Sequence, residues 1–180
     1  LQQRQSAYAW SWITCLLADR NRRYSGAFRE LGRRYPAESF AAVRQEVFDP
    51  LTADFTIEWT LLTRTLEYGH DFEASAIEFE AGSALGEPAT VHIAADRGWQ
   101  STGIAVAAGQ AVTITAAGQA TLADDPKPWL SEPEGITIRY AHGQPIGRLM
   151  GVVIGATTGD PPTRYLGEVM PVGGAATVIP

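Results

Sequence analysis

The chain has 180 residues, 45% of them hydrophobic and 19% charged, which excludes a disordered polypeptide, since disorder requires low hydrophobicity and high charge. A formal net charge of -6 at pH 7 argues against a nucleic acid or an anionic membrane bound through bulk charge. The single cysteine, Cys15, cannot form an internal disulfide, and it leaves the redox compartment open.

The first 70 residues have the apolar spacing of helices. In the first predicted helix the spacing is i, i+3, i+4, i+7 and i+8, at Ala9, Trp12, Ile13, Leu16 and Leu17. These residues lie in an uncharged stretch, 5–18, that is shorter than the roughly 20 residues of a membrane span. We therefore expect a helix packed on a core, followed by a short second helix around 24–33.

Two further helices are predicted before residue 70. Pro36 and Glu38 suit the opening turn of the third, and its apolar residues at helical spacing are Phe40, Val43 and Val47. The fourth has Thr52 as its predicted N-cap and Gly69 at its C-terminal end. Its apolar residues are Phe55, Trp59, Leu62 and Leu66.

The composition changes near residues 86–88, after which 13 of the 18 glycines occur. Apolar residues now alternate with small or polar ones, as in half-buried strands. The alternating residues are Val91, Ile93, Ile104, Val106, Val112, Ile114, Ile136, Ile138 and Tyr140. We predict an α+β chain with a helical lobe of about four helices over 1–87 and an antiparallel β-sandwich over 88–180.

One predicted hairpin has a testable register. A three-residue loop, 108–110, would pair Val106 with Val112 and Ile104 with Ile114, and would keep the apolar side chains on one face. A two-residue loop would divide them between both faces. We therefore predict the three-residue loop or a bulge.

No complete catalytic set is visible in the sequence. His70, His92 and His142 are far apart and lack the His-Glu-x-x-His spacing of a zinc site, so each is expected to be a structural histidine. Cys15 lies among apolar residues and is expected to be a small buried side chain rather than an activated thiolate. We expect the chain itself not to be an enzyme.

Four side chains are candidate ligand contacts. Trp99 and Trp129 could stack on the apolar face of a sugar, although Trp99 is better explained as a plug at one end of the sandwich. Arg139 and Tyr140, adjacent in a predicted strand, complete the ligand-binding set.

Four acidic residues lie in one predicted loop: Asp124, Asp125, Glu132 and Glu134. Calcium takes 6 to 8 oxygen ligands, so closely spaced carboxylates make calcium a possible cofactor. The more ordinary interpretation is that they are solvated loop charges, because the alternating Asp/Asn pattern of a dedicated calcium loop is missing.

Residues 96–118 resemble the opening strands of the galactose-binding-like, jelly-roll β-sandwich of small bacterial galactophilic lectins. The shared features are Trp99, the Thr102-Gly103-Ile104 run, the turn at Gly109 and a second alternating strand that ends at Gly118. The similarity continues weakly over 146–149. In those lectins a segment rich in Asp and Asn near the C-terminus holds calcium and sugar. Here the only acidic residues in 160–180 are Asp160 and Glu168, and there is no asparagine, so no binding residue is carried over.

Residues 6–12, Ser-Ala-Tyr-Ala-Trp-Ser-Trp, with the apolar helix that follows and Tyr24 to Phe28, are similar to the segment after the zinc-binding glutamate of bacterial gluzincin-type metallopeptidases. This resemblance implies a catalytic core encoded upstream of Leu1 as a partner in the same polypeptide. It also implies a periplasmic or extracellular location.

Three functions follow as hypotheses. The first is a non-catalytic accessory fragment, truncated at its C-terminus, whose sandwich binds carbohydrate or a cell-surface ligand; its sugar site would lie beyond Pro180 or be missing. The second is the C-terminal part of a zinc metallopeptidase. The third is a purely structural domain that covers the helical lobe. No nucleic-acid partner and no transmembrane segment are expected.

Overall fold

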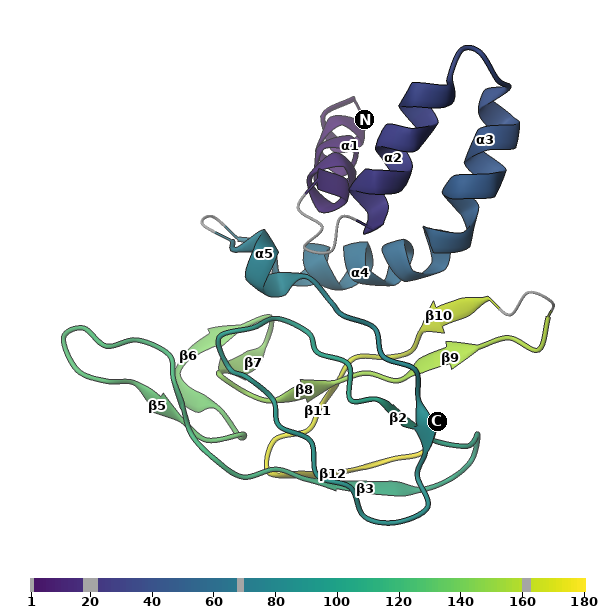
Figure 1. Cartoon of the computed structure of the whole chain (residues 1–180). Helices are drawn as coiled ribbons and strands as arrows, with labels where there is room; N and C mark the ends of the chain where they lie inside the picture. Colours follow the sequence, from purple (N-terminus) through teal and green to yellow (C-terminus); the bar gives the residue numbers. More distant parts are fainter. Residues whose placement is uncertain (1, 18–22, 68–69, 160–162) are drawn as a thin grey trace. The chain divides into compact units, whose positions relative to one another are not determined.

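A computed structural model of the chain describes residues 2–17, 23–67, 70–159 and 163–180. The contacts divide the chain into two compact units (Figure 1). Unit 1 consists of Leu1–Glu80, Asp96–Ser101 and Gly159–Arg164, and unit 2 of Ala81–Ala95, Thr102–Thr158 and Tyr165–Pro180. The chain is thus α+β, with helices first and many short strands after them.

The helices of unit 1 begin with α1 (Gln2–Leu17) and α2 (Arg23–Arg34). Then come α3 (Phe40–Val47), the 3-10 turn η1 (Asp49–Leu51) and α4 (Thr52–Thr65). A single turn, α5 (Phe72–Ser75), follows. The four helices predicted before residue 70 are present, and each has buried side chains.

Aromatic side chains form the centre of the unit 1 core. The ring of Phe55, which is fully buried, meets the edge of Trp12 at 4.4 Å and that of Tyr24 at 5.1 Å between centroids. Edge-to-face contacts of this kind are favourable beyond the area that they bury. The buried core cluster comprises Cys15, Leu16, Tyr24, Phe48, Phe55 and Leu62. The expected burial of Cys15 is confirmed.

The buried face of α1 differs from the predicted stripe. Ile13 is 53% exposed and Ala9 is exposed too, whereas Ser11 and Cys15 are buried beside Leu16. Ser11 is tolerated there because its hydroxyl donates to the Tyr8 carbonyl and accepts a hydrogen bond from Trp59 Nε1 at 3.1 Å. The hydrogen-bonded Ser11 is therefore buried on the face of α1 that packs on the core, whereas Ala9 and Ile13 are exposed.

Three details of the later helices also differ from expectation. Thr52 is the first residue of α4 rather than its N-cap, and its hydroxyl donates back to the Phe48 carbonyl because η1 runs straight into the helix. Phe40 is exposed, and its ring lies edge-to-face with that of Tyr35. The helix ends at Thr65, and Gly69 lies outside the described residues.

The strands are short, and each sheet among the described residues has two of them. β1 (Ser83–Ala84) pairs in parallel with β2 (Ile104–Ala105). Four further pairs are antiparallel: β3 (Val112–Thr115) with β12 (Ala175–Val178), β4 (Ala120–Thr121) with β5 (Leu130–Ser131), β6 (Ile136–Ala141) with β7 (Gln144–Ile146), and β8 (Met150–Gly151) with β11 (Met170–Pro171). β9 (Ile154–Ala156) pairs with β10 (Arg164–Leu166).

The predicted hairpin between Ile104 and Ile114 is wrong. β2 pairs with β1, and β3 pairs with β12, where Val112 faces Val178 and Ile114 faces Ala176. The apolar side of β3 thus has apolar partners from the far end of the sequence, and the Gly109 N–H donates to the Pro180 carbonyl rather than closing a hairpin.

Two other strand expectations fail. Val91 and Ile93 are exposed and belong to no strand. Ile138 and Tyr140 lie in β6 as predicted, but both are exposed. The β6–β7 register shifts between Ile136 and Tyr140, so Ile138 has no partner in β7, whereas Tyr140 faces Pro145. The strands described here form two-stranded sheets, and no sandwich is seen among them.

Candidate functional site

The predicted ligand contacts are divided between the two units. Trp99 is half-buried in the segment Asp96–Ser101 of unit 1, where the Gly98 N–H donates to the Ala74 carbonyl. Trp129 is half-buried in unit 2, and its backbone closes the loop between β4 and β5 through hydrogen bonds with Ala123 and Leu122. Because Trp99 belongs to unit 1, its interpretation as a plug of the sandwich is not supported.

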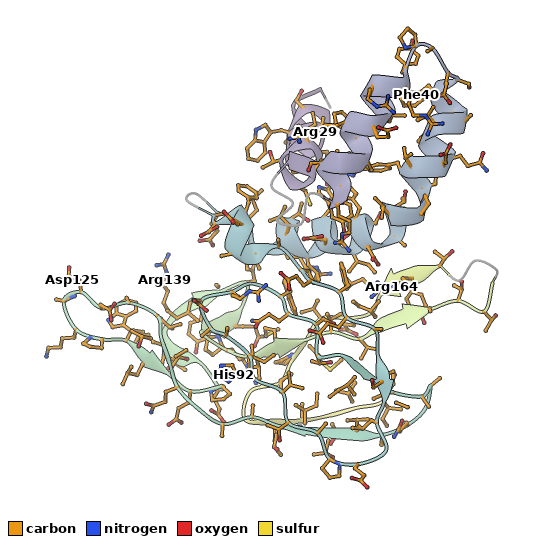
Figure 2. All side chains as sticks on the ribbon, viewed as in Figure 1. Arg29, Phe40, His92, Asp125, Arg139 and Arg164 are labelled. Carbon is orange, nitrogen blue, oxygen red and sulfur yellow. The ribbon has the colours of Figure 1, made fainter. Side chains whose placement is uncertain are left out.

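Arg139 and Tyr140 are both exposed in β6, and Figure 2 shows Arg139 projecting from this strand. Successive side chains of a strand point to opposite faces, so the guanidinium and the phenol ring lie on different sides of β6. Tyr140 faces Pro145 across the hairpin, while Ala141 faces Gln144. The structure therefore does not combine Arg139 and Tyr140 into one pocket.

The candidate calcium ligands are exposed carboxylates. Asp125 lies at the tip of the loop between β4 and β5 (Figure 2), next to Asp124, whereas Glu132 and Glu134 follow β5. Across the described part of the chain, no three His, Cys, Asp or Glu side chains form a group that could hold a metal ion. Calcium stays a prediction without a geometric site.

A polar arrangement that the sequence did not reveal surrounds the turn Gly173-Gly174 before β12. The Glu134 carboxylate occupies the place that a Cβ on Gly174 would take, and Arg148 Nη2 is 3.7 Å from the position of a Cβ on Gly173. The two charged side chains flank the turn but form no ion pair with each other in the described structure. No motif in the sequence predicted that Glu134 and Arg148 lie beside the same turn.

The contacts of Arg148 leave its charge uncompensated. Its backbone N–H donates to the Pro145 carbonyl, and Nη1 donates to Gln144 Oε1 at 2.9 Å. Nε is buried without a hydrogen-bond partner, and no carboxylate pairs with this guanidinium within the described residues. A half-buried cation held only by a neutral amide is suited to a further acceptor, because Arg has five donors and no acceptor.

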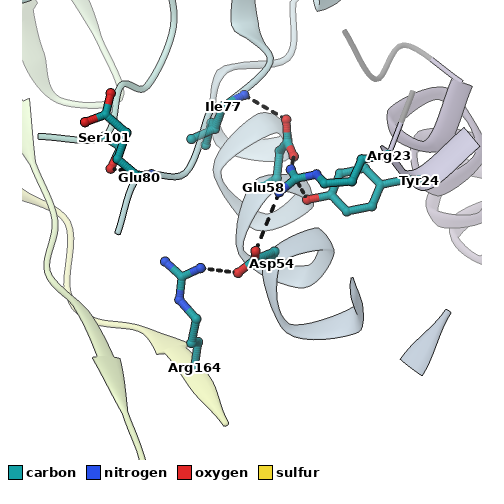
Figure 3. A network of polar contacts seen from close by, with 8 residues as sticks. All are labelled: Arg23, Tyr24, Asp54, Glu58, Ile77, Glu80, Ser101 and Arg164. Carbon is teal, nitrogen blue, oxygen red and sulfur yellow. Dashed lines mark hydrogen bonds and ion pairs between the residues drawn. The ribbon is translucent and has the colours of Figure 1, made fainter. Parts of the chain in front are cut away.

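A second polar network lies within unit 1 (Figure 3), and in it Arg23 Nε is buried without a hydrogen-bond partner. Glu58 is 7% exposed; its Oε1 accepts from the Ile77 N–H at 2.8 Å, and its Oε2 accepts from Arg23 Nη2 at 3.4 Å. Asp54 Oδ2 is 3.6 Å from Arg23 Nη1, and Oδ1 accepts from Arg164 Nη1. This network connects two helices with segments that follow them in the sequence.

Tyr24, which is fully buried, is part of the same network. Its hydroxyl accepts from Arg23 Nη2 at 2.6 Å and hydrogen-bonds to Glu58. Burial raises the pKa of the Tyr24 hydroxyl far above its usual value, the Glu58 carboxylate raises it further, and Arg23 opposes the shift. A neutral, enclosed tyrosine cannot reach a substrate, so we assign this network to stability.

No helix among the residues with described positions has the length and apolar character needed to cross a membrane. Comparisons of the sequence with family models and with curated proteins, and of the structure with solved structures, found no significant match.

Proposed function

We propose that the chain is a non-catalytic accessory piece whose β-rich part binds carbohydrate or a ligand on a cell surface. The finer fold belongs to the same proposal: residues 88–180 would form a galactose-binding-like β-sandwich attached to the helical lobe. The observation that carries the binding function is the exposed ring of Tyr140, which is 58% exposed on β6.

The Tyr140 ring projects from a part of β6 that is paired with β7. Tyr140 and Ala141 are paired with β7, so the backbone that carries the ring is fixed and only the side chain must be ordered when a ligand binds. A phenol ring offers an apolar face to the apolar face of a sugar and a hydroxyl to its polar edge. Arg139, on the other side of the strand, offers hydrogen-bond donors to the rest of an extended ligand.

The test is calorimetric titration of the full chain with galactose-terminated oligosaccharides, once with calcium and once with a chelator. Tyr140→Ala should weaken binding about tenfold, since an aromatic contact is worth about 1 kcal/mol beyond the area that it buries. The matched control is Tyr35→Ala, a tyrosine of nearly equal exposure (55%) in unit 1, which should bind as the parent does. The proposal is refuted if titration of the parent chain gives no binding heat and its melting temperature does not shift with the saccharide.

A further inference from the structure

We infer that Glu134 and Arg148 form a binding site for a vicinal diol, a pair of neighbouring hydroxyl groups, at the Gly173-Gly174 turn of unit 2. The inference rests on the proposed carbohydrate-binding function and gives it a polar site that does not depend on Tyr140. Both side chains lie beside the same turn: a Cβ on Gly173 would be 3.7 Å from Arg148 Nη2 and 3.9 Å from the Glu134 Cα.

Neither side chain is held by an ion pair within the described residues, and Glu134 is exposed. The carboxylate of Glu134 and the guanidinium of Arg148 make no ion pair in the described structure, although they adjoin the same two glycines. Arg148 Nη1 is already bonded to Gln144, and its Nε is sealed from solvent, so Nη2 is the end that remains for a ligand. One acceptor and one donor therefore flank a short stretch of backbone.

This combination suits hydroxyl groups better than it suits an ion. An anion would be attracted by Arg148 but repelled by Glu134, and a cation would meet the opposite difficulty. A hydroxyl both donates and accepts, so one hydroxyl of a diol can donate to Glu134 while its neighbour accepts from Arg148. Each of these hydrogen bonds involves a charged group and is therefore stronger than one between neutral groups.

The glycines make room for the arrangement. Gly173 has φ +57, a conformation that side chains with a Cβ rarely adopt, and a Cβ on Gly174 would displace the Glu134 carboxylate. Gly174 has no positive φ, and the atom displaced is the end of a flexible side chain, so Gly174→Ala should move the carboxylate without disturbing the fold. This substitution changes the position of a charge and leaves the total charge unaltered.

The experiment titrates the full chain with methyl β-galactoside and with a derivative whose neighbouring hydroxyls are O-methylated. Glu134→Gln and Gly174→Ala should each weaken binding of the unmodified sugar about tenfold or more, and the methylated sugar should bind no variant measurably. Arg148→Lys, which keeps the charge but loses the planar fork, should also bind more weakly.

Two controls match the chemistry of the substitutions. Glu168→Gln removes an exposed carboxylate elsewhere in unit 2, and Gly86→Ala adds a Cβ where nothing lies within 4 Å. Both should bind as the parent does. Far-UV circular dichroism confirms that each variant is folded before its affinity is compared.

The outcomes separate this inference from the proposed function. Parent binding that Tyr140→Ala weakens but Glu134→Gln and Gly174→Ala leave unchanged would overturn the diol site and keep the carbohydrate function. Loss of binding in a chelator would assign the effect of Glu134 to a metal ion and overturn the diol site as well. A parent chain that binds no saccharide would overturn both.

Discussion

Glu58 offers the sharpest test of how unit 1 is stabilised, and the perturbation is Glu58→Ala. The substitution removes the acceptor of the Ile77 N–H and the carboxylate that contacts both Arg23 and Tyr24. All three groups keep their positions in the folded state but lose a partner that water would supply in the unfolded state. Unfolding should therefore become easier.

The magnitude follows from burial. Removing one member of a buried ion pair usually costs about 3–5 kcal/mol. We take the lower end, about 3 kcal/mol, because the Arg23 side chain is 28% exposed and keeps Asp54 at 3.6 Å. With an m-value of about 2 kcal/mol/M, the urea midpoint should fall by about 1.5 M.

The assay is urea unfolding followed by circular dichroism at 222 nm, which reports on the helices. The control is Glu46→Ala, which removes an exposed carboxylate at 2.9 Å from Arg34 and should leave the midpoint almost unchanged. If Glu58→Ala is no more harmful than Glu46→Ala, the buried network does not stabilise the unit and the reasoning is refuted.

Three further predictions concern titration and backbone strain. The pKa of Tyr24 is raised in the folded state, so its contribution to stability is complete below the unfolded pKa of about 10 and is lost as the pH rises beyond it. Between pH 8 and pH 11, the free energy of unfolding should therefore fall less for Tyr24→Phe than for the parent chain. Arg34 lowers the pKa of Glu46 through a hydrogen bond, so Arg34→Gln should raise the pKa of Glu46 in an NMR titration, and an unchanged value would contradict the contact. Gly135→Ala should destabilise more than Gly143→Ala in chemical unfolding, by about 1 kcal/mol or more: both glycines have positive φ, but only a Cβ on Gly135 would meet backbone atoms at 2.9 Å, and equal losses would exclude this close approach.

The candidate site shows why function is harder to predict from this sequence than local structure. Arg139 and Tyr140 were predicted together as ligand contacts, yet neighbours in a strand face opposite ways. The arrangement of Glu134 and Arg148 had no sequence signal, since the two side chains share only their contact with the distant turn Gly173-Gly174. The sequence separation of Glu134 and Arg148 does not indicate that this turn lies beside both residues.

Local periodicity determined the type of element over much of the chain. Apolar residues at helical spacing predicted α1, α3 and α4, and alternation predicted β3 and β6, because hydrogen bonding and side-chain direction within an element repeat over a few residues. Only the tertiary structure decided which elements meet. Val112 pairs with Val178 rather than with Val106. Ser11 is buried on α1, where its hydroxyl accepts a hydrogen bond from Trp59. Local periodicity does not predict such pairings, because they join segments that lie far apart in the sequence and that compete for the same partner.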